Sequence, residues 1–169
     1  GVRVASGSLG QGLSVAVGVA QAKKLANDNH LVYVLMGDGE QEEGQIWEAA
    51  MYAPAKNVDN IVAIVDYNKK QIDGPTDDVL SLGDLRAKYE SFGWKVWECN
   101  GNDMQELVDT FNKIRENAHK GQSQILLAHT EMGMGVDFMM GTHKWHGVAP
   151  NDEQAANALS QLKETLGDY

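Results

Sequence analysis

The sequence has 169 residues, of which 43% are hydrophobic and 22% charged, so it fits one globular domain and excludes a disordered tail, a collagen-like fibre and a coiled coil. The net charge of −10 argues against nonspecific binding to nucleic acid and against docking on anionic membranes. Glycine is the one excess, at 18 residues, and indicates tight loops where the backbone approaches itself or a ligand.

Helix and strand patterns alternate along the chain. Short apolar runs bounded by turn residues predict four strands, at 31–36, 61–65, 94–99 and 124–128. The first run is apolar throughout and predicts a strand buried on both faces, whereas the third alternates and predicts a strand nearer an edge. Apolar residues at helical spacing predict five helices, at 13–26, 44–53, 81–89, 103–114 and 152–166.

Three side chains bear on where these helices begin and end. Pro54 is expected to stop the second helix, while Asp103 and Asp152 are suited to open the last two. Strands that alternate with helices predict an α/β fold, a doubly wound parallel sheet with helices on both faces. We expect residues 1–169 to form a single domain of this kind.

Ligands of doubly wound folds bind beyond the carboxyl ends of the strands. Gly37-Asp38-Gly39 follows the first predicted strand, and Asn68 follows the second. Together Asp38 and Asn68 offer one charged and one neutral oxygen, which suits Mg²⁺ or Ca²⁺. A lone Gly-Asp-Gly is usually only a turn. The two segments become informative together because one strand–helix–strand unit lies between positions 38 and 68.

Gly-Asp-Gly, a helix, a strand and then Asn, at this spacing, resemble the thiamine diphosphate motif. Three further segments resemble parts of transketolases: Gly-Ser-Leu-Gly-Gln-Gly at 7–12, a metal loop at 66–74, and Gly-Thr-His-Lys-Trp-His-Gly at 141–147. The resemblance covers nearly the whole chain in order. The most similar layout is the N-terminal, diphosphate-binding subunit of a transketolase split into two chains.

The resemblance implies a set of metal ligands. Asp38 would bind the metal, and Asn68 would bind both the metal and the diphosphate. The third protein ligand would be the backbone carbonyl of Lys70, with Mg²⁺ as the metal and Ca²⁺ as a possible substitute. The amide of Gly39 would meet the diphosphate.

The resemblance also implies contacts with the rest of the cofactor and with substrate. Gly7, Ser8 and Leu9 would lie along thiamine diphosphate. His143 would reach both the diphosphate and the substrate, and is the residue we expect to be catalytic.

The implied reaction is that of the pentose phosphate pathway transketolases. A two-carbon glycolaldehyde unit would pass from a ketose phosphate to an aldose phosphate. The family activates the cofactor's pyrimidine with a glutamate on a pyrimidine-binding domain, for which the sequence has no counterpart, so the resemblance implies a separate C-terminal partner chain. Glu43 and Glu48 match positions near the family's subunit interface, and we expect a homo- or hetero-oligomer.

The start of the sequence bears on activity. The family's domain begins well before the Gly-x-Leu segment and supplies further histidines there, whereas this sequence starts six residues before Gly7. The first residue is not Met, and no signal-peptide pattern follows it. We therefore expect a chain shortened at its start, whether a fragment, a processed form or an engineered piece, with weak activity even beside its partner.

Other interpretations stay open at this point. The chain could be a cofactor-binding module without activity, or a relative of the ketoacid decarboxylases and dehydrogenases, which share Gly-Asp-Gly and Asn. Gly141-Thr142-His143 disfavours that second class and also the deoxyxylulose phosphate synthases. His143 and His146 have the spacing of a zinc pair, but no third ligand appears nearby.

Composition also bears on the compartment. Cys99 is the only cysteine, so neither an intrachain disulfide nor a thiolate metal cluster can form. No apolar run approaches the ~18–20 residues of a membrane span. We expect a reducing, cytoplasmic location with no membrane partner.

Overall fold

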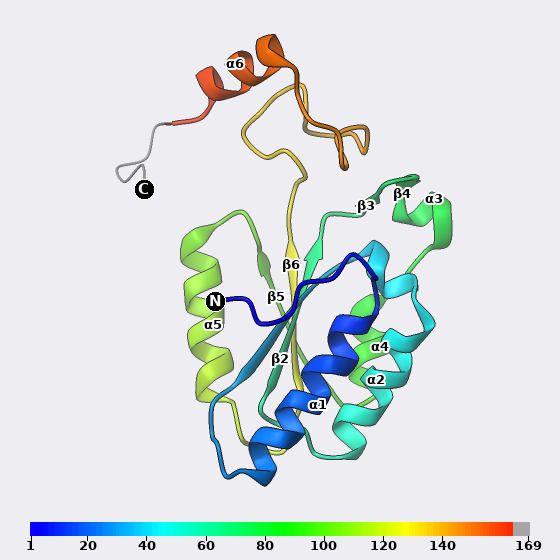
Figure 1. The fold of residues 1–169 in the computed structure, drawn as a ribbon, viewed down its shortest axis with the longest axis vertical. Helices are drawn as coiled ribbons and strands as arrows, with labels where there is room; N and C mark the ends of the chain where they lie inside the picture. The colour runs from blue at the N-terminus through cyan, green and yellow to red at the C-terminus, as the bar shows by residue number, and fades with distance from the viewer. Residues whose placement is uncertain (164–169) are drawn as a thin grey trace.

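Four parallel strands form the centre of the computed structural model, which describes residues 1–163 (Figure 1). The sheet order is β1-β2-β6-β5. Its strands are β1 (Val32–Gly37), β2 (Ile61–Tyr67), β5 (Lys95–Asn100) and β6 (Gln124–His129). Because the pairing is parallel and in register, Gly37 lies opposite Asp66, and Tyr67 and Asn100 lie opposite His129. The carboxyl ends of all four strands therefore share one edge.

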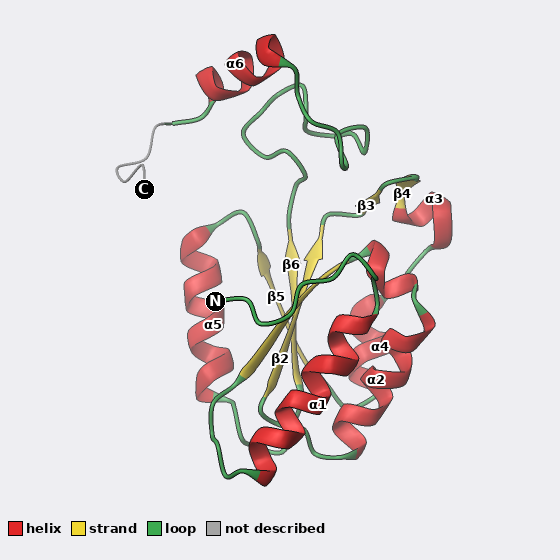
Figure 2. Cartoon of the chain, viewed as in Figure 1, coloured by secondary structure: helices red, strands yellow, loops and turns green. Residues whose placement is uncertain are grey.

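Helices cover both faces of the sheet, unequally (Figure 2). Helices α1 (Gln11–Leu25), α2 (Gly44–Ala55) and α4 (Leu85–Ser91) enclose the larger core. Helix α5 (Met104–Glu116) packs alone on the other face, where it buries Ile114 against Leu126. This arrangement confirms the predicted doubly wound α/β fold.

Short elements fill the loops at the carboxyl edge. The 3₁₀ turn η1 (Gly39–Glu42) precedes α2, and the two-stranded ribbon β3 (Lys70–Gln71) and β4 (Gly74–Pro75) follows β2, with α3 (Thr76–Leu80) after it. The long loop after β6 ends at α6 (Asp152–Gln161), which lies beyond the edge of the sheet in Figure 1. The sequence pattern predicts none of β3, β4 and α3.

Helix ends differ from the expectations where local capping decides them. Helix α4 begins at Leu85 rather than 81, because the Asp84 side chain accepts a hydrogen bond from the Ala87 amide and caps it there. Helix α2 continues one residue past Pro54. Asp103 caps α5 as predicted. Helix α6 ends at Gln161, and Leu166, which we expected on its apolar face, lies outside the described residues.

The prediction that the first strand is buried on both faces is wrong. Strand β1 lies at an edge of the sheet, and its outward side chains Tyr33 and Leu35 are 48% and 71% exposed. Helix α5 packs on β5, at the opposite edge, and its Phe111 makes an edge-to-face ring contact with Tyr33 of β1. The prediction of an edge strand near 94–99 is confirmed by β5. In residues 1–163, no helix has the length and apolar character needed to cross a membrane.

Candidate functional site

Asp38 joins the two segments that the sequence singled out. It follows β1 directly, is 2% exposed, and its Oδ1 accepts a hydrogen bond from the Gly39 amide at 2.8 Å. Its Oδ2 accepts a hydrogen bond from the amide of Lys69, in the loop after β2. The structure therefore brings the Gly-Asp-Gly turn into contact with the predicted metal loop.

The carboxylate of Asp38 is buried without a positive partner. Burial raises its pKa, the nearby charge of Asp66 adds to that effect, and the amides of Lys69 and Gly39 oppose it. Across residues 1–163, no Lys, Arg or His side chain forms an ion pair with Asp38. Buried charges are generally paired or bound to a metal, so the donor set here fits a hard divalent cation.

The loop after β2 is folded tightly around Asn68. The Asn68 Oδ1 accepts a hydrogen bond from the Lys70 amide at 2.9 Å, and its Nδ2 donates to Asp66 Oδ1 at 3.3 Å. Lys69 has a left-handed backbone, with φ of 62°. The contact of this loop with Asp38 is made by the Lys69 amide, and Asn68 and Lys70 flank Lys69 in the chain.

Gly39 occupies a position that allows no larger side chain. A Cβ built there would lie 2.9 Å from the Cβ of Gln71, closer than real Cβ atoms approach. The Gln71 Nε2 in turn donates to Glu42 Oε1 at 3.1 Å. The Gly39 amide, which we expected to meet the diphosphate, donates to Asp38 in this structure.

A buried hydrogen-bond chain fixes the Gly-Asp-Gly turn from behind. Tyr89 and Gln41 are both fully buried, and the Tyr89 hydroxyl donates to Gln41 Oε1 at 2.6 Å. The Gln41 Nε2 donates to the Gly37 carbonyl at 2.9 Å. Sequence reasoning missed both residues, since nothing in the pattern shows that two polar groups 48 positions apart meet in the core.

Glu40 connects this turn to the Gly7–Gly12 segment. Its Oε1 accepts a hydrogen bond from the Gly10 amide at 2.8 Å, and its Oε2 accepts one from the Gly37 amide at 3.1 Å. Gly10 has φ of +86°, and a Cβ there would lie 2.8 Å from the Cβ of Glu43. From the sequence, Glu40 would be explained by the general preference of acidic residues for a helix N-terminus. In the structure, its carboxylate has two specific amide partners.

Gly7, Ser8 and Leu9 lie just before α1. The Ser8 hydroxyl accepts a hydrogen bond from Gln11 Nε2 at 2.8 Å, and the Leu9 side chain is 54% exposed. The bond from Gly10 to Glu40 anchors this segment beside the Gly-Asp-Gly turn. The segment is thus on the same edge of the sheet as Asp38, with an apolar side chain open to a ligand.

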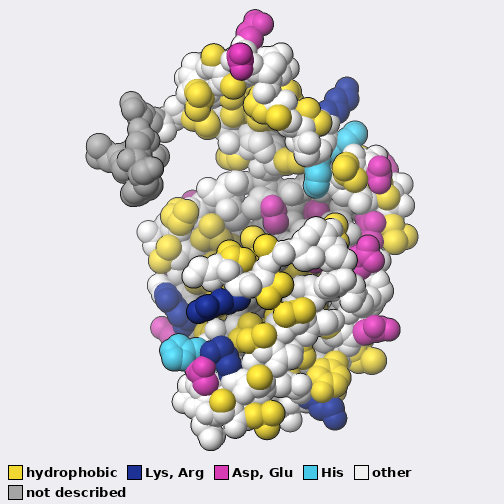
Figure 3. Space-filling view, in the orientation of Figure 1, with side chains coloured by type: hydrophobic (Ala, Val, Ile, Leu, Met, Phe, Trp, Pro, Cys, Tyr) yellow, Lys and Arg dark blue, Asp and Glu magenta, His cyan; other side chains and the backbone are white. Residues whose placement is uncertain are grey.

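His143 belongs to a separate segment, the loop after β6. Within the described part of the chain, no hydrogen bond joins its side chain to Asp38, Asn68 or Lys70, so the structure does not bring it into direct contact with them. Figure 3 shows a hollow between the segment bearing α6 and the body of the molecule, with acidic atoms inside it and histidine atoms at its rim. The loop after β6, which carries His143, lies beyond the carboxyl edge of the sheet in Figure 1.

The alternative of a zinc pair gains no support from the geometry. The contact between His143 and His146 is a backbone hydrogen bond of 2.9 Å. In the described residues there is no group of three or more His, Cys, Asp or Glu side chains placed to hold a metal ion. A cation at Asp38 would therefore depend on amide and carbonyl oxygens for its other protein ligands.

Comparison with known proteins shows which family the chain belongs to. The family described as "Transketolase, thiamine diphosphate binding domain" matches residues 1–167. The chain belongs to this family. The resemblance drawn from the four motifs is confirmed.

Relatives and solved structures of the transketolase family agree with that assignment. The chain is 44% identical over 166 residues to an apulose-4-phosphate transketolase subunit of Phocaeicola vulgatus, a match that covers 98% of this chain and 58% of that protein. It is 37% identical to a 6-deoxy-6-sulfo-D-fructose transketolase subunit of Clostridium sp., covering 97% and 59%. The crystal structure of Campylobacter jejuni transketolase superposes with a TM-score of 0.86 at 31% identity, over 95% of this chain and 26% of that one. The chain thus spans somewhat more than half the length of these two subunits.

Proposed function

We propose that this chain binds Mg²⁺ and thiamine diphosphate at the carboxyl edge of β1 and β2. We further propose that it serves a transketolase moving a glycolaldehyde unit from a ketose phosphate to an aldose phosphate. The observation that carries the proposal is Asp38, a buried carboxylate without a positive partner in the described residues, held between the Gly-Asp-Gly turn and the loop of Asn68. Membership of the transketolase family supports the choice of cofactor.

The residues present fit that cofactor by their chemistry. Asp38, the Asn68 side-chain oxygen and the Lys70 carbonyl would hold the metal, which prefers oxygen ligands and keeps positions open for phosphate. The Gly39 amide and Asn68 would meet the diphosphate, and Gly7, Ser8 and Leu9 would lie along the organic part. Occupancy by a metal would also neutralise the buried Asp38 charge.

Thiamine diphosphate, when bound, supplies the carbanion chemistry that breaks and forms the carbon–carbon bond. The chain itself binds and orients the diphosphate end. His143 would contact the diphosphate and the substrate from the loop after β6, donating hydrogen bonds to them. The loop would also reduce access of water to the edge of the sheet.

We propose that a partner chain completes the site. The relatives from Phocaeicola vulgatus and Clostridium are named as subunits, which supports a pyrimidine-binding C-terminal partner chain for this protein. Their names also support a sugar or sugar phosphate as substrate, with the ketose phosphate as our first choice. A cytoplasmic location remains a prediction.

The outer face of α1 and α2 fits an interface in such an assembly. A shallow groove lies between the two helices and includes Tyr52. Exposed apolar side chains on the same helices are Val15 and Val19 of α1 and Met51 of α2. Glu48 borders the same groove, and Glu43 is exposed at the start of α2. We propose that this face meets a second copy or the partner chain. Sedimentation with cofactor at micromolar concentration should show a dimer or larger species, and a monomer alone would count against self-association.

Calorimetric titration tests the cofactor proposal directly. Thiamine diphosphate should bind the chain with Mg²⁺ and bind far more weakly in EDTA, and equal affinity in both would overturn the proposed site. Single-turnover sugar transfer then separates an enzyme subunit from an inactive module. We expect no transfer by the chain alone and transfer once a pyrimidine-binding partner is added. Binding without transfer in either case would favour the module.

A further inference from the structure

Glu131, which directly follows Thr130 after β6, is bonded to three different segments. Its Oε1 accepts hydrogen bonds from the Lys70 ammonium at 2.9 Å and from the Gly141 amide at 2.8 Å. Its own amide donates to Asn102 Oδ1, in the loop after β5, at 2.7 Å. One side chain thus links the loop after β2 to the far end of its own loop, while its backbone is fixed to the loop after β5.

The Lys70 contact gives this residue a second connection to the site. The Lys70 amide donates to Asn68 Oδ1, next to Lys69, whose amide contacts Asp38. The Lys70 side chain, 15% exposed, extends to the Glu131 carboxylate. The Lys70 ammonium and the Gly141 amide converge on one carboxylate oxygen, and bonds to an ionised acceptor are stronger than neutral ones. The position of the loop after β6 is therefore tied to that of the predicted metal loop.

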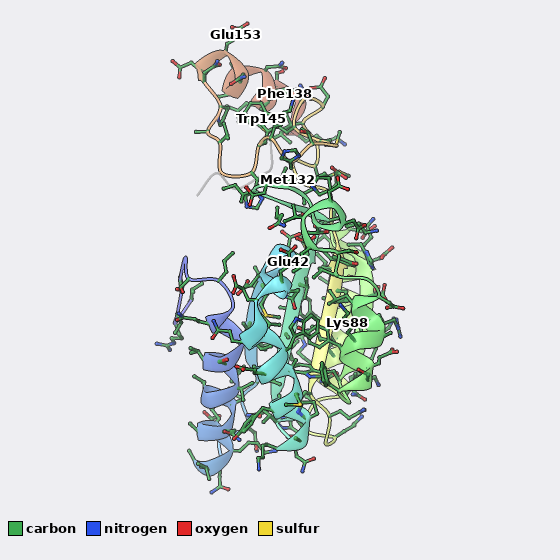
Figure 4. The ribbon with its side chains drawn as sticks, turned by 90° about the vertical axis from the view of Figure 1, so that its right-hand side faces the viewer. Glu42, Lys88, Met132, Phe138, Trp145 and Glu153 are labelled. Carbon is green, nitrogen blue, oxygen red and sulfur yellow. The ribbon has the colours of Figure 1, made fainter. Side chains whose placement is uncertain are left out.

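The Gly141 contact carries that tie to the Gly-Thr-His segment. Gly141 lies two residues before His143 and ten after Glu131, and its φ of +74° suits glycine. Fixing Gly141 closes the intervening loop. In Figure 4, Met132, the residue after Glu131, lies between Glu42 on the body of the molecule and the Phe138–Trp145 pair in the outer part of the loop. The Glu131 contacts therefore lie where the outer part of the loop joins the body of the molecule.

We propose that Glu131 is a positioning residue, which with the Lys70 side chain clasps the loop and sets His143 over the metal loop. The proposal rests on the proposed function in so far as His143 acts at that place. The clasp itself is a property of the free chain. Glu131 is 37% exposed in its side chain, so the contact is modest in energy.

Amide exchange measured by NMR on the full ¹⁵N-labelled chain tests the clasp without any ligand. In the wild type the Gly141 amide should exchange several-fold more slowly than in Glu131→Ala, roughly 3- to 10-fold for a partly exposed charge-assisted bond. Lys70→Met should give part of that loss. Glu153→Ala, which removes an exposed carboxylate from α6, is the matched control and should leave Gly141 unchanged. Equal Gly141 exchange in the wild type and Glu131→Ala would overturn the proposal.

A second measurement connects the clasp to function. In Glu131→Ala, calorimetric affinity for thiamine diphosphate with Mg²⁺ should stay within about 3-fold of the wild type, because Asp38 and Asn68 remain. Sugar transfer with the partner should fall about 10-fold or more through misplacement of His143. Unchanged transfer would overturn the positioning role. If the wild type itself binds no cofactor, the proposed function fails while the exchange result still decides the clasp.

Discussion

The two segments that would face the cofactor are held in place by different physical means. The Gly-Asp-Gly turn rests on a buried, neutral chain from Tyr89 through Gln41 to the Gly37 carbonyl. The loop after β6 is fixed at its surface, by the Glu131 contacts, by Trp145 Nε1 donating to the Phe138 carbonyl at 2.9 Å, and by Asp137 bonded to Gln161 of α6. The first arrangement is built into the core, whereas the second depends on contacts that water and salt reach.

Because of this difference, we expect mutations in the two segments to have different consequences. A buried bond that loses its partner leaves an unsatisfied group, so damage behind the turn should appear as lost stability. A surface contact can be replaced by water, so damage in the loop should appear as lost activity with little change in folding. Asp38, the proposed metal ligand, differs from both cases. It lies in the core-held turn, but only a ligand-binding measurement would reveal its proposed function.

The largest effect is expected from Asp38→Asn. Loss of the charge removes the principal ligand of the proposed metal, and Mg²⁺-dependent affinity for thiamine diphosphate should fall more than about 100-fold, since changes to groups that merely support a ligand cost about 10- to 100-fold. Asp38→Asn removes the cost of the buried charge, since a buried carboxylate with a raised pKa is destabilising when ionised. Its amide nitrogen also replaces one of the two oxygens that accept the Gly39 and Lys69 amides, so the loss of stability should not exceed about 1–3 kcal/mol. Calorimetry and urea unfolding measure the two effects. The control is Asp109→Asn on the exposed face of α5, and equal binding by both variants would contradict the assignment.

His143→Ala is the corresponding change in the loop after β6. Sugar transfer in the presence of the partner should drop by about 10²-fold, the size expected when a proton-transferring or substrate-positioning group is lost. The free energy of unfolding should stay within ~0.5 kcal/mol of the wild type, as for other surface loops. His30→Ala, at a side chain 87% exposed after α1, serves as control. A large loss of stability in His143→Ala would show instead that this histidine is held by core contacts, as the Gly-Asp-Gly turn is.

The meeting of the Asp38 and Asn68 segments could be predicted from the sequence, whereas the buried Tyr89–Gln41 contact behind the turn could not. Asp38 and Asn68 follow adjacent parallel strands, so the register of β1 and β2 alone brings their segments together. The loop side could be predicted only through its resemblance to a family motif. The contacts that place it join positions such as 70 and 131, which no local pattern relates. The exposed face of β1 was mispredicted for a similar reason, since an apolar run does not reveal which helices cover it.

Gln41→Leu tests the buried hydrogen-bond chain that holds the Gly-Asp-Gly turn. The substitution fills the space but leaves the Tyr89 hydroxyl and the Gly37 carbonyl without their partner in the core. Unfolding in urea should show a loss of about 1–3 kcal/mol. Adding Tyr89→Phe removes the orphaned hydroxyl, so the double variant should cost less than the sum of the two single changes. Simple additivity would show that the hydrogen-bond chain does not act as a unit.

The smallest effect is expected at the root of the loop, where Glu98 of β5 accepts hydrogen bonds from His129 Nε2 at 2.7 Å and from Arg86 Nη1 at 2.8 Å. The bond from His129, and then that from Arg86, holds the pKa of Glu98 below its ordinary value of 4.5. A carboxyl whose pKa is lowered by folding stabilises the folded chain above its unfolded pKa. That contribution disappears as the pH falls below about 4.5 and through the lower folded value.

Glu98→Gln should therefore be less stable than the wild type by about 0.2–1 kcal/mol at pH 6, the range for a partly exposed ion pair. The difference should shrink as urea unfolding is repeated toward pH 4, and should also shrink in about 0.5 M NaCl because salt screens the pair. Glu116→Gln is the control, at an exposed carboxylate that forms no ion pair within residues 1–163. The loss in Gln41→Leu should not respond to salt, because its contacts are neutral and buried. A salt-dependent Gln41→Leu together with a salt-independent Glu98→Gln would reverse the contrast between the core-held turn and the surface-held loop.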